Sequence, residues 1–429
     1  MRLLDAIPME YPQSAASAAL APAEYGYYFV IFYTVLGAPL GIILMGSIGS
    51  GFLLIPVLAL CFLALGPGIV NTMRSAWVPL ACGITYLFLQ LAVHGESLYE
   101  PYVYPFGQWI LSLVIVQALA AHRPHFLNRF LWFTLFMGLS MLPYMTPSQG
   151  GGYERVALNK ELGYANANAM AGWFGFCVVC LVIKGYLEQR TISRFVAWGL
   201  ALLSFYVVTL TISRGALLAI TVSLLVASRR LLKGGFLPLL LLGGCILGLV
   251  ELGVFDQAVR SYSLRAGEET GRFRVWPLLI ERFLGSPLIG VGAAHPGAIT
   301  STGKYVTPHN SFLLFAVASG ILPLLLFCAY LVRSGLSALR TGRSGEFESA
   351  FHLPLVVYAV LITCAGNMDF MSPWAIVALS LPVAAADGVS MHGASSDVAT
   401  LGDRHHLHRP YRTIDVLDGP LRASGEKRV

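Results

Sequence analysis

Long apolar segments separated by short polar loops dominate the pattern of this chain. Runs of roughly 15–25 apolar residues match the length that a helix needs to cross a bilayer. The pattern predicts about twelve such helices. Their predicted ranges are 28–46, 50–67, 76–94, 104–121, 128–145, 165–184, 194–212, 215–229, 235–252, 310–333, 352–368 and 373–389.

The apolar stretch from Ser204 to Ser228 contains one charge, Arg214. A single helix over this stretch would be too long and would place a guanidinium near its centre. Two helices joined by a turn at Ser213–Gly215 would bring the charge to the membrane surface, which costs much less free energy. We therefore predict two helices here.

The composition agrees with a membrane protein. Of the 429 residues, 56% are hydrophobic and only 12% are charged, and the mean hydropathy is +0.69. Soluble domains carry about 25% charged residues. The fold class is thus predicted as an all-α, polytopic membrane protein, and the net charge of +6 reports orientation rather than a nucleic-acid partner.

The distribution of Lys and Arg predicts the orientation. With the N-terminus in the cytoplasm, the internal loops carry twelve basic residues, and the four short outer loops carry only Arg214. This asymmetry favours both termini inside. We divide the chain into a transmembrane domain, 1–389, and a polar tail, 390–429, which its composition predicts to be disordered.

Two longer outer loops break this charge bias and need another reason for their basic residues. The loop 145–164 contains Arg155, and the loop 253–309 contains several arginines. The alternation in Gly271–Trp276 could direct two guanidinium groups to one side. Guanidinium groups bind phosphate oxygens in pairs, so we predict that Arg265, Arg272 and Arg274 bind a lipid-linked diphosphate. The alternative is that they bind lipid head groups or pair with nearby glutamates.

His309 lies between this loop and the apolar segment that follows. Imidazole groups titrate near neutral pH, so His309 could accept a proton from an attacking hydroxyl. A lone histidine at a helix end is more often structural, but the preceding arginines favour a functional role. Arg214, alone in its turn, is either functional or a side chain that extends from a helix end towards water.

Acidic residues on the outer side show no ligand-like spacing, and the first outer loop, 46–50, has none. We therefore predict no metal.

At these residues the chain resembles the O-antigen ligase and O-antigen polymerase superfamily of bacterial inner-membrane glycosyltransferases. Arg214 and Leu218 fit an Arg-x3-Leu element, and His309-Asn310 with Gly320 fit most of a His-Asn motif. The last position of that motif is Pro323, a departure from the family pattern. The segment Gly163–Asn168 resembles the family's Asn-containing entry to the sixth helix.

The resemblance implies a fold related to the GT-C glycosyltransferases, with 253–309 as the periplasmic catalytic loop. It implies an oligosaccharide donor on undecaprenyl diphosphate in the inner membrane. Arginines would hold the diphosphate, and His309 with Arg214 would act in an inverting transfer without metal or cofactor. We expect further contacts with the acceptor or glycan from a larger set, namely Arg155, Asn166, Asn168, Asn310, Tyr262 and Trp276.

The shared motifs leave the acceptor open. A polymerase would add lipid-linked repeats to a growing polysaccharide, as in exopolysaccharide synthesis of the xanthan type. A ligase would transfer the glycan to lipid A-core. The departure at Pro323 favours the polymerase slightly. A polymerase would have a chain-length regulator and export proteins as partners. A polysaccharide transporter is a remote alternative, because the predicted spans are almost free of charge.

Overall fold

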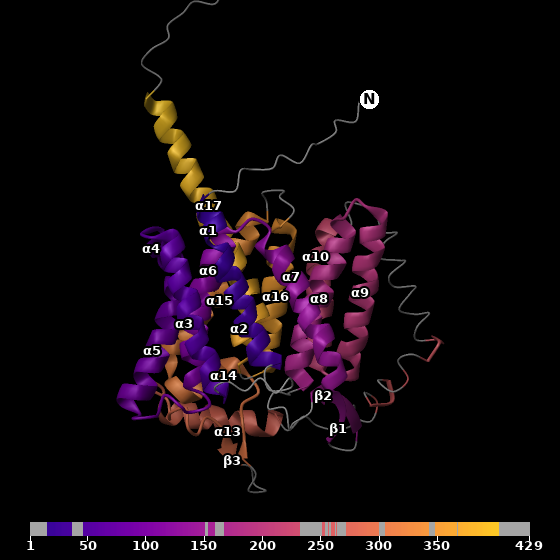
Figure 1. Cartoon of the computed structure of the whole chain (residues 1–429). Helices are drawn as coiled ribbons and strands as arrows, with labels where there is room; N and C mark the ends of the chain where they lie inside the picture. The colour runs from indigo at the N-terminus through magenta and orange to yellow at the C-terminus, as the bar shows by residue number, and fades with distance from the viewer. Residues whose placement is uncertain are drawn as a thin grey trace, which may run out of the picture. The chain divides into compact units, whose positions relative to one another are not determined.

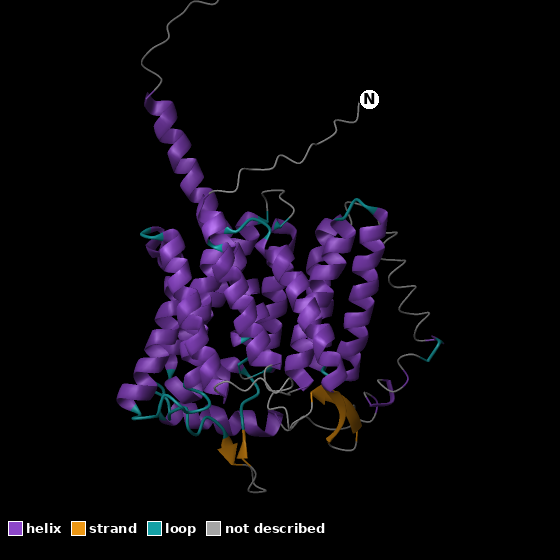
Figure 2. Cartoon of the chain, in the orientation of Figure 1, coloured by secondary structure: helices purple, strands orange, loops and turns teal. Residues whose placement is uncertain are grey.

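The computed structural model describes residues 15–36, 46–150, 153–158, 167–231, 251–253, 256, 259–261, 263, 272–299, 305–342, 348–366 and 368–402. The chain divides into two compact units, Met1–Gly388 and Val389–Val429. Most described helices belong to the first unit, where Figures 1 and 2 show them side by side. In the second unit, the described residues 389–402 are helical.

Helices form most of the described chain. In order, the helices are α1 Ala15–Ala19, α2 Ala21–Leu36, α3 Gly46–Leu65, α4 Gly68–Ser75, α5 Trp77–Phe88, the π-helix η1 Leu89–Val93, α6 Tyr104–His122, α7 Phe126–Met141, the 3₁₀ helix η2 Leu142–Tyr144, α8 Ala167–Leu187, α9 Thr191–Leu210, α10 Arg214–Leu231, α13 Arg272–Gly285, α14 Ser311–Ser319, α15 Ile321–Thr341, α16 Ser349–Ala365, the 3₁₀ helix η5 Asp369–Met371, and α17 Pro373–Gly402.

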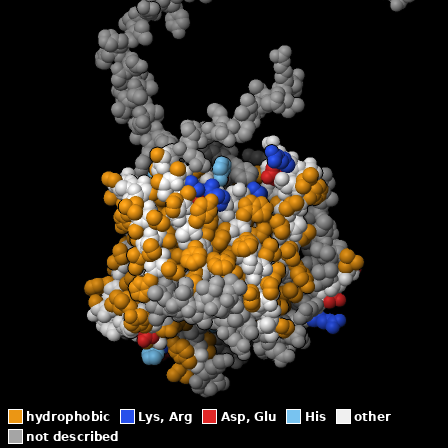
Figure 3. Space-filling view, viewed as in Figure 1, with side chains coloured by type: hydrophobic (Ala, Val, Ile, Leu, Met, Phe, Trp, Pro, Cys, Tyr) orange, Lys and Arg blue, Asp and Glu red, His pale blue; other side chains and the backbone are white. Residues whose placement is uncertain are grey.

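The helices have the length and the surface of membrane spans. Among the described residues, five helices are long and apolar enough to cross a bilayer, and the α4–α5–η1 pair, bent by 75°, would be a sixth. Four shorter apolar helices accompany them. Large apolar side chains such as Leu63 and Ile192 point outward, and Figure 3 shows them as a broad belt. The all-α membrane class is confirmed. The count of twelve stays a prediction, because residues 235–250 of the predicted span 235–252 lie outside the described residues.

The predicted turn at Arg214 is confirmed. Helix α9 ends at Leu210, and α10 begins at Arg214. Helix α8 packs against α9, and α10 packs against α16. The charge therefore lies at a helix end, as its cost inside an apolar segment requires.

The prediction of one helix over 310–333 is wrong. The chain forms a short helix, α14, and then a long one, α15, with a break at Gly320. Gly320 has a φ of 79°, in the region that favours glycine. Pro323 lies in the first turn of α15, where the missing N–H breaks no intrahelical bond. This position explains why proline is tolerated at the motif's last residue.

Three further boundaries differ from the sequence predictions. Helix α2 begins at Ala21, well before the predicted start at 28. The predicted span 76–94 ends in a π-helix and is preceded by the separate helix α4. Helix α17 continues to Gly402, so the first residues of the tail 390–429 are helical rather than disordered. Composition predicts the polarity of such a segment but not where a helix stops.

The two long loops, 145–164 and 253–309, contain structure that the sequence did not predict. Strands β1, Met145–Gly150, and β2, Tyr153–Leu158, pair antiparallel. Strands β3, Ala298–Ile299, and β4, Tyr305–Val306, form a second antiparallel pair. The alternation predicted for 271–276 is replaced by helix α13, which places positions two apart on different faces. Figure 1 shows α13 and the β1–β2 pair at the same end of the first unit.

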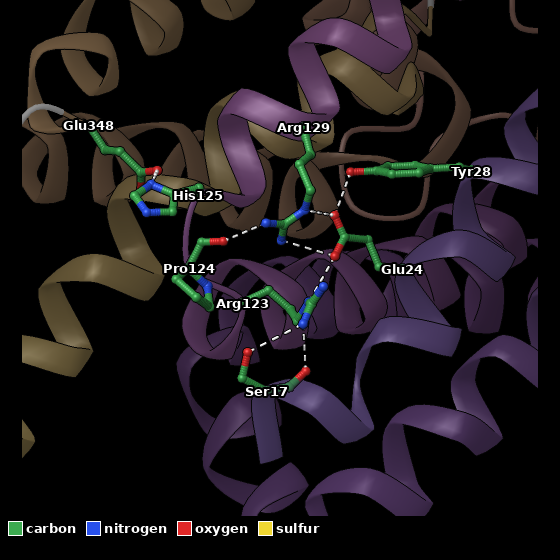
Figure 4. Close-up of polar contacts among 8 residues, drawn as sticks. All are labelled: Ser17, Glu24, Tyr28, Arg123, Pro124, His125, Arg129 and Glu348. Carbon is green, nitrogen blue, oxygen red and sulfur yellow. Dashed lines mark hydrogen bonds and ion pairs between the residues drawn. The ribbon is translucent and has the colours of Figure 1, made fainter. Parts of the chain in front are cut away.

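A charged cluster closes the end of the first unit where α2 begins (Figure 4). The buried carboxylate of Glu24 accepts hydrogen bonds from Arg123 Nε at 2.8 Å, Arg129 Nε at 2.6 Å and Tyr28 Oη at 2.8 Å. Arg123 also donates to the carbonyl of Ser17 at 2.7 Å. Burial alone raises the pKa of Glu24, but these hydrogen bonds outweigh it and hold the pKa below its usual value.

Candidate functional site

The candidate site lies at the end of the first unit that carries α13, where α10, α14 and α16 meet. Asn310 caps α14, because its side-chain oxygen accepts hydrogen bonds from the amides of Phe312 and Leu313. Its side-chain nitrogen donates to the carbonyl of Cys364 at 3.2 Å. Ser311 Oγ donates to the carbonyl of Gly366 at 2.8 Å. The residues that follow His309 are thus tied to the end of α16.

Arg214 reaches the same end of α16 from the other side. It is the first residue of α10, and Gly215 follows it. A side chain at Gly215 would place its Cβ 2.8 Å from the Cβ of Ala365, so glycine lets the two helices approach closely. His309 and Arg214 are 95 residues apart in sequence, yet their neighbours Asn310 and Gly215 both lie against residues 364–366. The pairing of His309 with Arg214 in one site stays a prediction.

We call the part of the site around residues 364–366 at the end of α16 the corner. The backbone is strained on both sides of this corner. His309 has a φ of 49°, and Ile212, two residues before Arg214, has a φ of 53°. Such values are uncommon for any residue with a Cβ and rare for a β-branched one. Each costs on the order of 1–3 kcal/mol and persists only where the surroundings fix it. The fold thus holds the backbone at His309, and at a position two residues before Arg214, against its local preference.

Two guanidinium groups on this end have unused donors. Nη2 of Arg214 and Nε of Arg155 are buried and have no hydrogen-bond partner among the described residues. Arg155 lies on β2, opposite Ser148. A buried donor without a partner costs about 1–3 kcal/mol. The N-terminus of α10 adds the positive end of its dipole at Arg214. An anion bound here would satisfy the open donors.

Helix α13 packs over the start of α14. Trp276 donates its indole N–H to the carbonyl of Pro308 at 3.1 Å. Val275 and Leu279 of α13 form a small apolar core with Val317 of α14. Trp276 thus contacts the residue before His309, and the predicted glycan-contact residue also has a structural role.

The remaining predicted residues are placed only in part. The backbone of Arg272 and Arg274 belongs to the first turn of α13, but their side chains are outside the described part of the chain. Asn168 lies in the first turn of α8. Arg265, Tyr262 and Asn166 lie outside the described residues.

Sequence reasoning gave no role to Asp369, although it lies in the same corner. A Cβ built on Gly366 would be within contact distance of the Asp369 carboxylate. Gly366 also accepts the hydrogen bond from Ser311. The described residues contain no group of three His, Cys, Asp or Glu side chains that could hold a metal ion, and the absence of a metal stays a prediction.

An apolar cavity of about 230 Å³ lies next to this corner. Aromatic side chains line much of it, including Tyr27, Trp109 and Trp173. Met368 and Met371 also line it, and they follow Gly366 along the chain. The loop that holds α14 in place therefore also borders an apolar cavity.

The helices define a multi-pass membrane protein, and the candidate site lies at one end of them. Residues 199–328 match the profile of a family described as O-antigen ligase. The matched region includes Arg214, α13 and His309, so this part of the chain is similar to the O-antigen ligase family. Members of this family are membrane glycosyltransferase-like enzymes, and the family implies a lipid-linked glycan substrate. Among curated proteins, none matches this chain.

Proposed function

We propose that the protein is a polysaccharide polymerase that transfers oligosaccharide repeats from undecaprenyl diphosphate to a growing lipid-linked glycan. The observation that carries the proposal is that Asn310 and Gly215, the neighbours of His309 and Arg214 in the region that matches the family, both lie against the end of α16. A base and an open guanidinium in one site would suit the transfer of a sugar from a diphosphate.

In the proposed reaction, a hydroxyl of the acceptor glycan attacks the anomeric carbon of the donor. The new C–O bond forms as the bond to the diphosphate oxygen breaks. The imidazole of His309 takes the hydroxyl proton. Undecaprenyl diphosphate leaves with the electron pair, and guanidinium groups stabilise its charge. A single displacement of this kind inverts the anomeric centre and needs no metal.

Arg214 is the described residue best suited to the diphosphate. Its open Nη2 donor and the N-terminus of α10 both favour an anion at this position. Arg265, Arg272 and Arg274 would complete the diphosphate site from the outer loop. The neighbouring cavity, lined by aromatic and methionine side chains, is suited to the apolar part of a lipid-linked substrate.

The test uses purified full-length protein in lipid nanodiscs with an undecaprenyl-diphosphate oligosaccharide and no other acceptor. The proposal predicts elongated products that do not depend on divalent metal. His309→Ala and Arg214→Ala would each abolish elongation. Arg194→Ala is the matched control, because Arg194 hydrogen-bonds the Glu188 carbonyl near the start of α9.

The same assay distinguishes the acceptor. Transfer that requires added lipid A-core would identify a ligase and contradict the polymerase. Elongation that survives both His309→Ala and Arg214→Ala would contradict the site. For either conclusion to hold, Arg194→Ala must elongate the glycan at the wild-type rate.

A further inference from the structure

We propose that Gln90 is a positioning residue that holds helix α13 in register with α14, the short helix that follows His309. The proposal deepens the proposed function, on which it rests, by assigning a distant side chain to the alignment of the site. Gln90 lies in the π-helix η1, which is distant in sequence from the region that matches the family.

Both arms of the Gln90 amide are used, and the residue is fully buried. Its nitrogen donates to the carbonyl of Ala318 at 3.0 Å. Its oxygen accepts from the amide of Ala293 at 2.8 Å. One side chain thus joins the end of α14 to the segment that follows α13. An apolar residue of the same size could form neither bond, and a carboxylate could form only one.

The segment 286–293, which we call the docked segment, replaces the hydrogen bonds that the broken helix loses. Val291 N donates to the carbonyl of Val317 at 2.8 Å, and Gly292 N to that of Ala318 at 3.1 Å. In return, Ile321 N donates to the carbonyl of Pro287 at 2.8 Å. A break in an apolar helix is tolerated only where the protein satisfies the freed backbone groups.

The docked segment approaches the break too closely for side chains. A Cβ on Gly290 would lie 2.5 Å from the carbonyl carbon of Ala318. A Cβ on Gly320 would lie 2.3 Å from the carbonyl oxygen of Leu288. Both glycines also have positive φ values. The fit between the two segments therefore depends on backbone geometry that small shifts would disturb.

Two neighbours of Gln90 hold the same segment. His94 Nε2 lies 2.9 Å from the carbonyl of Ile289, and Ala294 N donates to Glu96 Oε1 at 2.8 Å. Glu96 N in turn donates to the carbonyl of Gln90 at 2.9 Å. Single π-helical turns inside helices occur frequently at functional sites. Here the π-turn and the residues after it present three side chains to the docked segment and to Ala294, which follows it.

Helix α13 is held near its start and after its end, and these two attachments affect the geometry of the site. Trp276, near its start, contacts Pro308 beside His309. Gly285, at its end, leads directly into the docked segment that Gln90 holds. The two attachments together fix the position of α13 along α14. They would set the distance between arginines on α13 and the imidazole of His309, where a 1 Å error costs about a hundredfold in rate.

The test compares Gln90→Met with Gln117→Met in the full-length protein in nanodiscs. Gln117 is also buried, lies on α6, and donates to Ser75 Oγ at 2.9 Å. We expect Gln90→Met to lower kcat by roughly 10- to 100-fold while KM for the undecaprenyl-diphosphate donor stays within about threefold. Gln117→Met would change neither. Loss of folded protein alone would lower the yield of active enzyme. It would not produce a kcat difference that depends on whether position 90 or position 117 is changed.

Hydrogen–deuterium exchange gives a readout that does not depend on activity. Gln90→Met is expected to speed exchange in 286–293 by at least about tenfold, since each 1.4 kcal/mol of lost protection gives that factor. If this variant does not accumulate, Gln90→Glu replaces it, because it keeps the acceptor for Ala293 and loses only the donor to Ala318.

Unchanged exchange in the docked segment, or equal changes in the Gln90 and Gln117 variants, would overturn the proposal. So would faster exchange with an unchanged kcat. Faster exchange confined to 286–293 in a protein whose wild type transfers no sugar would support the attachment by Gln90 and contradict the proposed function instead.

Discussion

The indole N–H of Trp276 donates to the carbonyl of Pro308 at 3.1 Å, so the arginine-bearing helix α13 is attached to the residue before His309. The bond joins two parts of the outer loop that are far apart in sequence. The bond connects the predicted diphosphate-binding helix, through the ring of Trp276, to the residue before the predicted base.

Trp276→Phe tests this bond. The substitution keeps the ring and removes the donor, which should lower stability by only about 1 kcal/mol. We expect a larger effect on turnover, with kcat reduced roughly tenfold, because α13 would shift relative to His309. Steady-state kinetics and thermal unfolding measure the two effects. Trp132→Phe, on α7, is the control, and equal losses in both variants would refute the role of the bond.

The strained backbone at His309 predicts a separation of stability from activity. His309→Asn should abolish transfer and leave the melting temperature nearly unchanged, because asparagine tolerates the left-handed region. His309→Val should abolish transfer and also lower the free energy of unfolding by about 1–2 kcal/mol, since a β-branched residue is disfavoured there. Thermal unfolding in detergent measures the difference. Equal melting temperatures for the two variants would contradict the strain argument.

The break between α14 and α15 predicts opposite effects for two glycines. Gly320→Ala should destabilise the protein by roughly 1–3 kcal/mol, because its φ is positive and its Cβ would meet the Leu288 carbonyl. Gly335→Ala, within α15, should stabilise it by about 0.5–1 kcal/mol, since its Cβ would meet no atom within 4 Å. Chemical unfolding monitored by fluorescence gives both values. A stabilising Gly320→Ala would show that the helix is continuous.

The Glu24 cluster predicts a loss of stability in acid. The pKa of Glu24 is lowered in the folded protein, so its contribution is present above the unfolded pKa of about 4.3 and is lost as the pH falls through the lower folded value. Glu24→Gln should lower stability at pH 7, on the order of 3–5 kcal/mol, because it leaves two guanidinium groups without their carboxylate.

Unfolding measured between pH 7 and pH 3 tests this linkage. The wild type should lose stability below about pH 4.3, and Glu24→Gln should lose less over the same range. Parallel curves for the two proteins would mean that Glu24 does not contribute to the acid sensitivity.

Much of the site could be predicted from local sequence. Arg214 had to lie at a helix end because a charge within 204–228 is costly, and the structure starts α10 there. The apolar pattern predicted a helix start at 310, and Asn310 caps α14. The alternation in Gly271–Trp276 did not predict helix α13, because a short alternating pattern does not by itself distinguish a strand from a helix.

The sequence by itself determined the apolar helices, the turn at Arg214 and the position of His309 beside a basic loop, because the cost of burying charge acts on each segment separately. Only the tertiary structure decided the break at Gly320, the capture of the docked segment by Gln90 and the packing of Asn310 and Gly215 against the end of α16. These depend on hydrogen bonds and close backbone approaches between residues far apart in sequence, which no local pattern specifies.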